Sequence, residues 1–294
     1  MCLMKELVVI SGKGGTGKTS VVASFAALAD NNALADCDVD AADLHLVLEP
    51  EIQHREDFSG GKKARILQDQ CTSCGECESL CVFDAISHDA DDKYEVDHIK
   101  CEGCGVCVHF CPSDAIEFKE AVNGEWYISR TRFGPMVHAK LGIAESNSGK
   151  LVSLVRSKAR EIAERERLNL VIIDGSPGIG CPVIASLAGA DVALIVTEPT
   201  ISGLHDLERV CELTRHFRIR TVVCINKYDI NEALTQEIEK KARRIDAPVI
   251  GKISYDPLVT QAQIMKKSVV ECEGNGAAQQ IKYLWKRVKS ELSE

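Results

Sequence analysis

The sequence predicts an α/β protein with a mainly parallel sheet, covered by helices on both faces and interrupted by a small α+β insert. Two observations support this prediction. Apolar runs of strand length alternate with helical patterns in the first and last parts of the chain, and this alternation stops in a cysteine-rich middle block. Strands that are apolar on both sides are typical of a parallel sheet between two helical layers. A chain of 294 residues has room for one large domain that carries an insert.

The first βαβ unit precedes the insert. We expect a buried strand over residues 5–11, a helix over about 18–29 and a second strand over 33–36. Residues 51–63 are polar, contain Gly60 and Gly61, and read as a linker. After the insert we expect a helix over 150–167, strands at 169–174, 191–196, 220–225 and 248–253, helices near 181–188, 203–216, 231–244 and 257–267, and a last helix over 277–292.

The domain boundaries follow from these patterns. The α/β domain covers residues 1–50 and 121–294, and the insert covers residues 64–120. Asn123-Gly124 lies between two apolar runs, at 116–118 and 126–128, and predicts a β-hairpin at the end of the insert.

The excess acidic charge is confined to the insert. The chain has a net charge of −9, and residues 64–120 alone hold 13 acids and four bases, so the remainder is balanced. An acidic segment disfavours nucleic acid and favours a basic protein as a partner.

Targeting signals are missing from the sequence as it stands. No apolar run approaches the ~20 residues of a membrane span, and residues 1–10 do not resemble a secretory signal. We therefore expect a cytoplasmic protein. In that reducing compartment, the 14 cysteines indicate metal binding or catalysis rather than disulfides.

Residues 12–19, GKGGTGKT, match the phosphate-binding pattern G-x-x-x-x-G-K-[ST] at every fixed position, between a predicted strand and a predicted helix. Backbone N–H groups of such a loop bind phosphate oxygens, helped by the helix N-terminus. Lys18 is placed to neutralise the β/γ-phosphates, and Thr19 to bind Mg²⁺. The predicted nucleotide-binding residues are Gly12, Lys13, Gly14, Gly15, Thr16, Gly17, Lys18, Thr19, Ser20 and Asn226.

The additional lysine at position 13 makes this loop resemble the deviant Walker A motif of the MinD/ParA/nitrogenase-iron-protein class of ATPases. The resemblance implies a homodimer, or a heterodimer with a paralogue, that encloses two ATP molecules. It also implies that Lys13 reaches the phosphates bound by the partner subunit. A solvent-exposed loop lysine is the alternative.

Two further segments resemble motifs of the same class. Asp36-Cys37-Asp38 resembles switch I, which makes Asp38 the candidate for orienting the attacking water, with Asp40 and Asp43 as alternatives. Residues 170–178, LVIIDGSPG, resemble a Walker B strand that continues into switch II. There Asp174 would serve Mg²⁺, and Gly178 could follow the γ-phosphate by a backbone rotation. Asn226, at the end of a strand, fits the adenine-reading position of the class. The predicted catalytic residues are Lys13, Lys18 and Asp38.

Eight of the 14 cysteines form two runs with one spacing. The first is Cys71, Cys74, Cys77 and Cys81, and the second is Cys101, Cys104, Cys107 and Cys111, which Pro112 follows. This is the bacterial ferredoxin pattern, occurring twice. Two Cys₄ zinc sites are the alternative, but zinc favours separated pairs.

The resemblance to bacterial ferredoxins implies that the fourth cysteine of each run binds the cluster of the other run. One [4Fe–4S] cluster would then be held by Cys71, Cys74, Cys77 and Cys111, and the second by Cys81, Cys101, Cys104 and Cys107. Val82 stands where the second run has Pro112, and this departure removes no ligand.

The remaining segments of interest have ordinary interpretations. We expect Cys37 and Cys224 to be core residues and His109 to be a surface residue. We expect Cys181 to be packed in the interior; the alternative is that it lies near the two-fold axis of a dimer and binds a ligand there. Ile281, Leu284, Trp285, Val288 and Leu292 form one apolar stripe, which we expect to cover the sheet rather than a membrane.

The whole chain resembles MinD-superfamily ATPases with an inserted ferredoxin domain. This resemblance implies an ATP-hydrolysing protein with ATP, Mg²⁺ and two [4Fe–4S] clusters as cofactors, in which closure of a dimer is coupled to electron transfer towards a basic redox partner. Two other functions are considered: an accessory ATPase in iron–sulfur or metallocofactor assembly, and a MinD-like positioning or redox-sensing switch. The absence of a C-x-x-C pair outside the insert weighs against delivery of the chain's own clusters.

Overall fold

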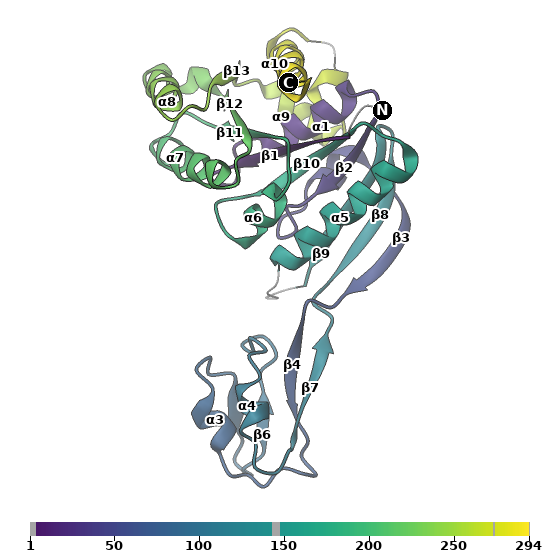
Figure 1. The fold of residues 1–294 in the computed structure, drawn as a ribbon, viewed down its shortest axis with the longest axis vertical. Helices are drawn as coiled ribbons and strands as arrows, with labels where there is room; N and C mark the ends of the chain where they lie inside the picture. Colours follow the sequence, from purple (N-terminus) through teal and green to yellow (C-terminus); the bar gives the residue numbers. More distant parts are fainter. Residues whose placement is uncertain (1–3, 143–147, 273, 294) are drawn as a thin grey trace. The chain divides into compact units, whose positions relative to one another are not determined.

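The computed structural model describes residues 4–142, 148–272 and 274–293. The described chain forms two compact units. Unit 1 contains the residues up to Arg55, Trp126–Lys140 and the chain from Ser148 onward, and unit 2 contains Glu56–Glu125 with Leu141 and Gly142. Figure 1 shows the chain entering and leaving unit 2 along neighbouring strands.

Unit 1 is built on a nine-stranded sheet with the order β13-β12-β11-β1-β10-β2-β9-β8-β3. The strands from β13 to β9 in this order pair in parallel. The strand bounds are β1 Lys5–Ser11, β2 Asn32–Asp36, β3 Glu51–Phe58, β8 Gly124–Thr131, β9 Gly134–Leu141, β10 Leu170–Pro177, β11 Val192–Thr197, β12 Arg220–Asn226 and β13 Val249–Ile253.

Helices cover both faces of this sheet (Figure 1). Leu7 and Val9 of β1 belong to a core that α1, α2, α9 and α10 complete, whereas their neighbours Val8 and Ile10 are buried on the opposite face. Burial of both faces explains why the strands are continuously apolar. The helix bounds are α1 Lys18–Leu28, α2 Leu44–Leu48, α5 Ser148–Glu166, α6 Cys181–Leu187, α7 Ile201–His216, α8 Glu232–Arg244, α9 Pro257–Ile264 and α10 Gly276–Ser293.

The prediction for the last helix is confirmed. The apolar stripe of α10 is buried, and the Trp285 ring lies 4.8 Å from the ring of Phe25 in α1. The basic residues of α10, by contrast, are exposed. Within the described residues, no helix combines the length and apolar character that crossing a bilayer would require.

Unit 2 contains two small antiparallel sheets and two short helices. β4 pairs with β7, and β5 pairs with β6. Six buried side chains form its core: Ala64, Ile66, Ile86, Tyr94, Cys107 and Ile116. The element bounds are β4 Gly61–Ile66, α3 Glu76–Leu80, β5 Ile86–His88, β6 Tyr94–Val96, α4 Val106–His109 and β7 Ile116–Ala121.

Two predictions about the ends of the insert are wrong. The polar segment 51–63 is not a linker, because β3 and the start of β4 occupy it. β3 is an edge strand of the large sheet with most of its side chains exposed, so its composition resembles that of a loop. Asn123-Gly124 does not form a hairpin turn, since β7 pairs with β4 while β8 joins the large sheet.

Candidate functional site

A cavity of about 510 Å³ lies at the carboxyl ends of the parallel strands of unit 1. Ligands in open α/β sheets bind at this edge because the connecting loops meet there. The β1–α1 loop lines the cavity with Gly14, Gly15, Thr16, Gly17, Lys18, Thr19 and Ser20, and the strand ends add Asp38, Ser176 and Asn226. The structure therefore brings most of the predicted nucleotide-binding residues together around one space.

The shape of the β1–α1 loop depends on glycine. Gly15 and Gly17 have φ of 79° and 84°, and Gly17 is the N-cap of α1. A Cβ atom on Gly17 would lie 2.4 Å from Nδ2 of Asn226, so a side chain is excluded there for two reasons. The loop leads into α1 so that the N-terminus of this helix faces the cavity, as an anion site requires.

Lys18 is buried and lies between two carboxylates. Its Nζ is 2.8 Å from Oδ1 of Asp174 and 3.2 Å from Oδ2 of Asp38. Burial alone would lower the pKa of Lys18, but the charges of Asp174 and Asp38 outweigh burial and raise it. The lysine of the phosphate loop is thus a charged group held by carboxylates of its own chain.

The negative charge of the carboxylates around Lys18 is not fully compensated. Asp36 and Asp174 lie opposite each other on β2 and β10, and both are buried. Within the described residues, Oδ2 of each has no hydrogen-bond partner. Burial, and then the charge of Asp174, raise the pKa of Asp36 well above its usual value, and burial also raises the pKa of Asp38. This group of oxygens can accept a divalent cation, because a cation would compensate the excess negative charge.

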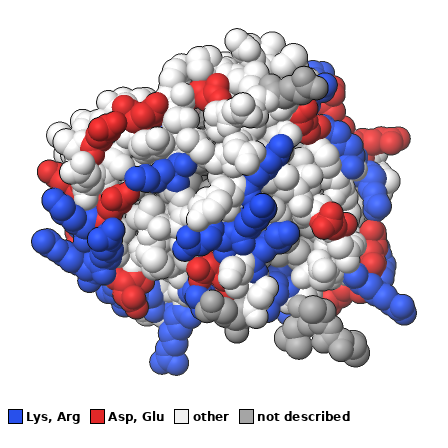
Figure 2. Space-filling model, turned by 90° about the horizontal axis from the view of Figure 1, so that it is seen from above, with Lys and Arg blue, Asp and Glu red and all other residues white. Residues whose placement is uncertain are grey.

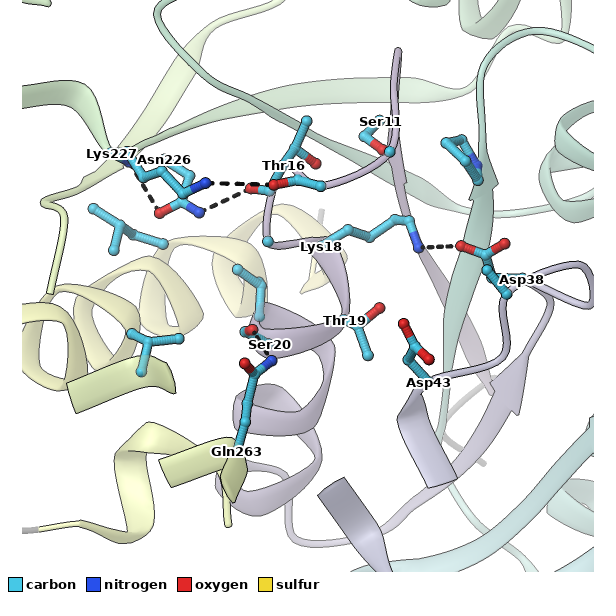
Figure 3. A pocket seen from close by; sticks show the side chains of 18 of the residues that line it. Ser11, Thr16, Lys18, Thr19, Ser20, Asp38, Asp43, Asn226, Lys227 and Gln263 are labelled. Carbon is cyan, nitrogen blue, oxygen red and sulfur yellow. Dashed lines mark hydrogen bonds and ion pairs between the residues drawn. The ribbon is translucent and has the colours of Figure 1, made fainter. Parts of the chain in front are cut away.

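Figure 3 shows the side chains of Thr19 and Asp43 pointing into the same part of the cavity as Asp38. Asp40 also lines the cavity. Hydroxyl and carboxylate oxygens are the ligand types that Mg²⁺ uses beside phosphate. Asp43 and Asp40 therefore stay beside Asp38 as candidates for cation or water binding, as the sequence indicated.

Gly12 and Lys13 lie outside the residues that line the cavity, unlike residues 14–20 of the same loop. Lys13 instead contacts two residues of its own chain. Its Nζ is 2.6 Å from Oε1 of Glu198 and donates to Oγ1 of Thr200 at 3.1 Å. Oε2 of Glu198 also accepts Lys227 at 3.3 Å. Burial would raise the pKa of Glu198, but Lys13 and Lys227 more than offset burial, and the pKa is lowered. Glu198 thus holds Lys13, the additional lysine of the loop, within its own chain. No sequence motif indicated this contact.

Asn226 connects the end of β12 to the β1–α1 loop. Its Nδ2 donates to the Thr16 carbonyl at 2.8 Å, and its Oδ1 accepts the Lys227 N–H at 3.0 Å (Figure 3). An amide has a second N–H and a second lone pair, so it keeps capacity for a base edge. Asn226 therefore has a structural role that the sequence did not predict, in addition to lining the cavity.

Part of the cavity wall is formed by residues that sequence reasoning missed. Tyr255, Val259 and Gln263 line it from α9 and the loop before this helix. Gln263 donates to Oγ of Ser20 at 2.9 Å (Figure 3). These residues belong to no motif, and only the packing of α9 beside α1 brings them to the loop.

The end of β10 and the residue that follows it lie beside the loop. Oγ of Ser176 donates to the Cys37 carbonyl at 2.6 Å, which joins the predicted switch II to the predicted switch I. Gly178 has φ of 91°, and its N–H donates to the Ser11 carbonyl at 2.8 Å. A residue at positive φ that is tied to the phosphate loop fits the role predicted for this glycine.

In unit 2, the eight cysteines line two cavities, four in each. The first cavity is lined by Cys71, Cys74, Cys77 and Cys111. The second is lined by Cys81, Cys101, Cys104 and Cys107. These are the two sets that the ferredoxin resemblance implied.

Backbone hydrogen bonds explain why the runs exchange their fourth cysteine. The Leu67 N–H, just before the first run, donates to the Ala115 carbonyl just after the second at 2.8 Å. The Asp97 N–H, before the second run, donates to the Ala85 carbonyl after the first at 2.7 Å. Each run therefore starts where the other ends.

The thiols themselves are not arranged around a single ion. Within the described residues, no group of three or more His, Cys, Asp or Glu side chains is placed to hold one metal ion. Burial, with smaller contributions from Cys107, Cys71 and Cys74, raises the pKa of Cys77 to about 11. Burial and Cys101 likewise raise the pKa of Cys107. As free thiols they are neutral, whereas a bound metal would deprotonate them.

The other described cysteines differ in their exposure to solvent. Cys37 and Cys224 are buried, as predicted. Cys181 is exposed, so the prediction that it packs in the interior is wrong: it begins α6, with its Cβ beside Gly149. Cys2 lies outside the described residues. His109 is exposed, as expected.

Comparisons with known proteins agree with the geometry of unit 1. Residues 7–269 match the model of the CobQ/CobB/MinD/ParA nucleotide-binding domain. An uncharacterised protein of Methanocaldococcus jannaschii is 31% identical to this chain over 98% of its length and 97% of the relative. A second uncharacterised protein of that organism is 27% identical over 78% of this chain and 83% of the relative.

Solved structures show the same fold. The cell division ATPase MinD of Pyrococcus furiosus aligns with a TM-score of 0.58 and 17% identity, over 98% of this chain and 99% of that protein. MinD of Pyrococcus horikoshii, solved with Mg-ADP, aligns with a TM-score of 0.57 and 17% identity, over 97% of this chain and 96% of that protein. With its β1–α1 phosphate loop and its parallel sheet, the chain belongs to the CobQ/CobB/MinD/ParA family of nucleotide-binding domains and has the fold of a MinD/ParA-type P-loop ATPase.

Proposed function

We propose that this protein hydrolyses ATP and couples closure of an ATP-bound dimer to electron transfer through two [4Fe–4S] clusters held by unit 2. The observation that carries this proposal is the division of eight cysteines into two cavities of four, in a chain that also has a nucleotide pocket. Four thiols around a cavity suit a cluster better than a single ion, because each thiolate of a cluster binds a different iron.

In the nucleotide pocket, the β1–α1 loop binds the phosphates through its backbone N–H groups. Lys18 would leave Asp174 and Asp38 to neutralise the β/γ-phosphates, and the carboxylates that it leaves would be available to hold Mg²⁺. Thr19 and Asp174 serve Mg²⁺, and Asp38 orients the water that attacks the γ-phosphate. The products are ADP and inorganic phosphate.

The position of Lys13 supports a dimeric active state. Residues 14–20 of the loop line the pocket, whereas the ammonium group of Lys13 is held by Glu198 and Thr200. Release from Glu198 would allow it to reach the phosphates bound by a partner subunit, as the MinD/ParA resemblance implies. The partner subunit is a second copy of the chain or a paralogue.

In unit 2, one set of thiolates (Cys71, Cys74, Cys77 and Cys111) would hold one cluster, and Cys81, Cys101, Cys104 and Cys107 would hold the other. A [4Fe–4S] cluster accepts and donates a single electron. The N–H groups of Ala85 and Ala115 donate to the sulfurs of Cys81 and Cys111, at 3.4 and 3.3 Å. Hydrogen bonds of this kind tune the reduction potential of a cluster.

The first test separates the two sites. Lys18→Ala removes the group that neutralises the phosphates, so ATP turnover should be lost. The iron and sulfide content of the anaerobically purified protein should stay the same, because Lys18 lies in unit 1. Normal ATP hydrolysis by the variant would show that the phosphate site is assigned wrongly.

The second test addresses coupling. Cluster reduction is titrated by EPR with and without MgATP, and we expect the potential to shift. A shift of about 60 mV for a one-electron cluster corresponds to a coupling free energy of roughly 1.4 kcal/mol. Equal potentials would argue against thermodynamic coupling.

A role as an accessory ATPase in metallocofactor assembly is the second candidate. The exposure of Cys74 and Cys104 favours it, because one thiol of each set is accessible to an acceptor protein. Transfer of iron and sulfide to an acceptor that depends on ATP, without a change in potential, would support assembly instead of electron transfer.

A further inference from the structure

The two cysteine runs have the same spacing, displaced by 30 residues along the chain. Asp84 and Asp114, three residues after the last cysteine of each run, have φ of 49° and 50°. Their N–H groups donate to the carbonyls of Cys81 and Cys111, each at 3.3 Å. Because the two turns are built alike, a difference in side chains between them is not required by the turn itself.

Side chains at several equivalent positions near the two cysteine sets differ in polarity. At four equivalent positions next to the cysteines of the first cavity, the chain has Asp69, Glu76, Pro112 and Ser113. At the same positions next to the cysteines of the second cavity, it has Ile99, Val106, Val82 and Phe83. Asp69, Glu76 and Ser113 are charged or polar where the second set has Ile99, Val106 and Phe83, while Pro112 corresponds to the likewise apolar Val82.

These apolar side chains contribute little to the fold. Val82 is 84% exposed, Ile99 67%, Phe83 41% and Val106 38%, although Phe83 also lines the second cavity. The second run has Pro112 and Ser113 in an equivalent turn, so folding explains neither Val82 nor Phe83. Each of the four lies within two residues of a cysteine of the second set. Exposed apolar side chains near one site indicate an interaction surface.

The surroundings of the second cavity favour one kind of partner. Residues 64–120 have 13 acids and four bases, and Glu102 lines the second cavity beside Phe83. An apolar centre within an acidic surface is complementary to a basic protein that has an apolar centre of its own. A second copy of unit 2 would bring like charges together.

We infer that Val82 and Phe83, with Ile99 and Val106, form the docking surface for a basic redox protein, and that electrons leave through the second cysteine set. This inference rests on the proposed function. It assigns different roles to the two sets: the first lies away from the docking site, and the second exchanges electrons with the partner.

The test uses zinc-substituted cytochrome c, a basic, fluorescent and redox-inert protein with an apolar haem edge. Its binding to the oxidised holoprotein is measured by fluorescence quenching at low ionic strength. The double variant Val82→Pro/Phe83→Ser copies Pro112 and Ser113 of the other run, so the turn should be kept. We expect its Kd to rise about tenfold. Val82→Ser/Phe83→Ser is a second version that introduces no proline.

Phe110→Ser is the matched control. Phe110 is 58% exposed and precedes Cys111 of the first cavity, so this variant removes an exposed aromatic ring at the other set. We expect its Kd to stay within about twofold of the wild-type value. None of these variants changes a charge, so electrostatic attraction is the same in all of them.

The outcomes are distinguishable. An unchanged Kd for both double variants, or an equal loss for Phe110→Ser, would overturn the docking surface while leaving the clusters and the proposed function intact. A wild-type dimer without ATP that the double variants dissociate would assign the surface to a second copy and also overturn the inference. Failure of the proposed function is read separately, as wild-type protein that binds no iron and sulfide.

Discussion

Lys13 and Lys18 lie in the same loop, but their neighbours differ. Lys18 is buried between Asp38 and Asp174, whereas Lys13 is partly exposed and paired with Glu198. A lysine that points into the pocket serves nucleotide binding within one chain. A lysine held outside the pocket can be released without loss of that binding site.

Substitution of Lys13 should therefore affect ATP binding differently from substitution of Lys18. Lys13→Ala should bind ATP within about threefold of the wild-type affinity but lose at least tenfold in turnover and lose the ATP-dependent dimer. Calorimetry and sedimentation velocity, each with and without MgATP, measure these effects. If Lys13→Ala loses ATP binding as Lys18→Ala does, the role in the partner's site is wrong.

His138 is buried in a row of rings. The Tyr127 ring lies 4.9 Å from it and the His45 ring 6.2 Å, and Ser129 is hydrogen-bonded to Nε2 at 2.8 Å. Burial, and then the charge of His45, lower the pKa of His138 to about 4. Since the unfolded chain binds this proton with a pKa near 6.5, the folded state binds fewer protons between pH 4 and 6.5, and stability falls as the pH falls through this window.

His138→Gln tests this pH dependence. The contribution of His138 to the free energy of unfolding should decrease by about 2 kcal/mol between pH 7 and pH 5. The variant should lack this part of the decrease. Urea unfolding at both pH values, in wild type and variant, measures the difference, and parallel losses in the two proteins would contradict a buried neutral His138.

At the scale of elements, the conformation of the β1–α1 connection depends more on Gly17 than on Gly14. Gly17 has positive φ and lies against Asn226, whereas Gly14 is not at positive φ and a Cβ there would meet nothing within 4 Å. The pattern of glycines in the sequence does not reveal this difference. It arises because β12 ends beside the loop.

Gly17→Ala should lower the free energy of unfolding by about 2 kcal/mol without nucleotide, since a left-handed alanine costs roughly 1–2 kcal/mol before any clash. Gly14→Ala should change it by less than about 0.5 kcal/mol. Denaturant unfolding compares the two variants. Equal destabilisation would show that the loop does not depend on the contact with Asn226.

The elements that sequence analysis missed share a physical cause. β3 is an edge strand with exposed, charged side chains, and such strands avoid the apolar alternation by which strands are recognised. β8 lies near the same edge, and its apolar residues suggested a local hairpin because they follow Asn123-Gly124. In the structure, pairing of β8 with β3, which is distant in the sequence, replaces the local turn predicted at Asn123-Gly124.

At the scale of the molecule, charge is divided between the two units. On the face of unit 1 that Figure 2 shows, basic side chains gather over α8 and α10 with acidic ones among them. This mixture agrees with the balanced charge outside residues 64–120. The acidic excess belongs to unit 2, so added salt should weaken the binding of a basic partner there.

The core of unit 2 is small, since its six buried side chains include the thiol of Cys107. Units of this size depend on metals or cross-links. Removal of iron with a chelator should make residues 64–120 sensitive to protease, whereas unit 1 should remain intact and bind nucleotide. Limited proteolysis with mass spectrometry measures this. First cuts within unit 1, or a resistant unit 2, would contradict the prediction.

The sequence by itself determined the phosphate loop, the cysteine runs, the alternation of strands and helices and the location of the acidic excess. Each depends on residue type at a fixed spacing, which local geometry turns into a loop, a strand or a helix. Tertiary structure alone decided that Glu198 holds Lys13, that Asn226 supports the loop, that Cys181 is exposed and that β3 and β8 extend the sheet. These features depend on contacts between distant segments, and no spacing along the chain encodes which segments will meet.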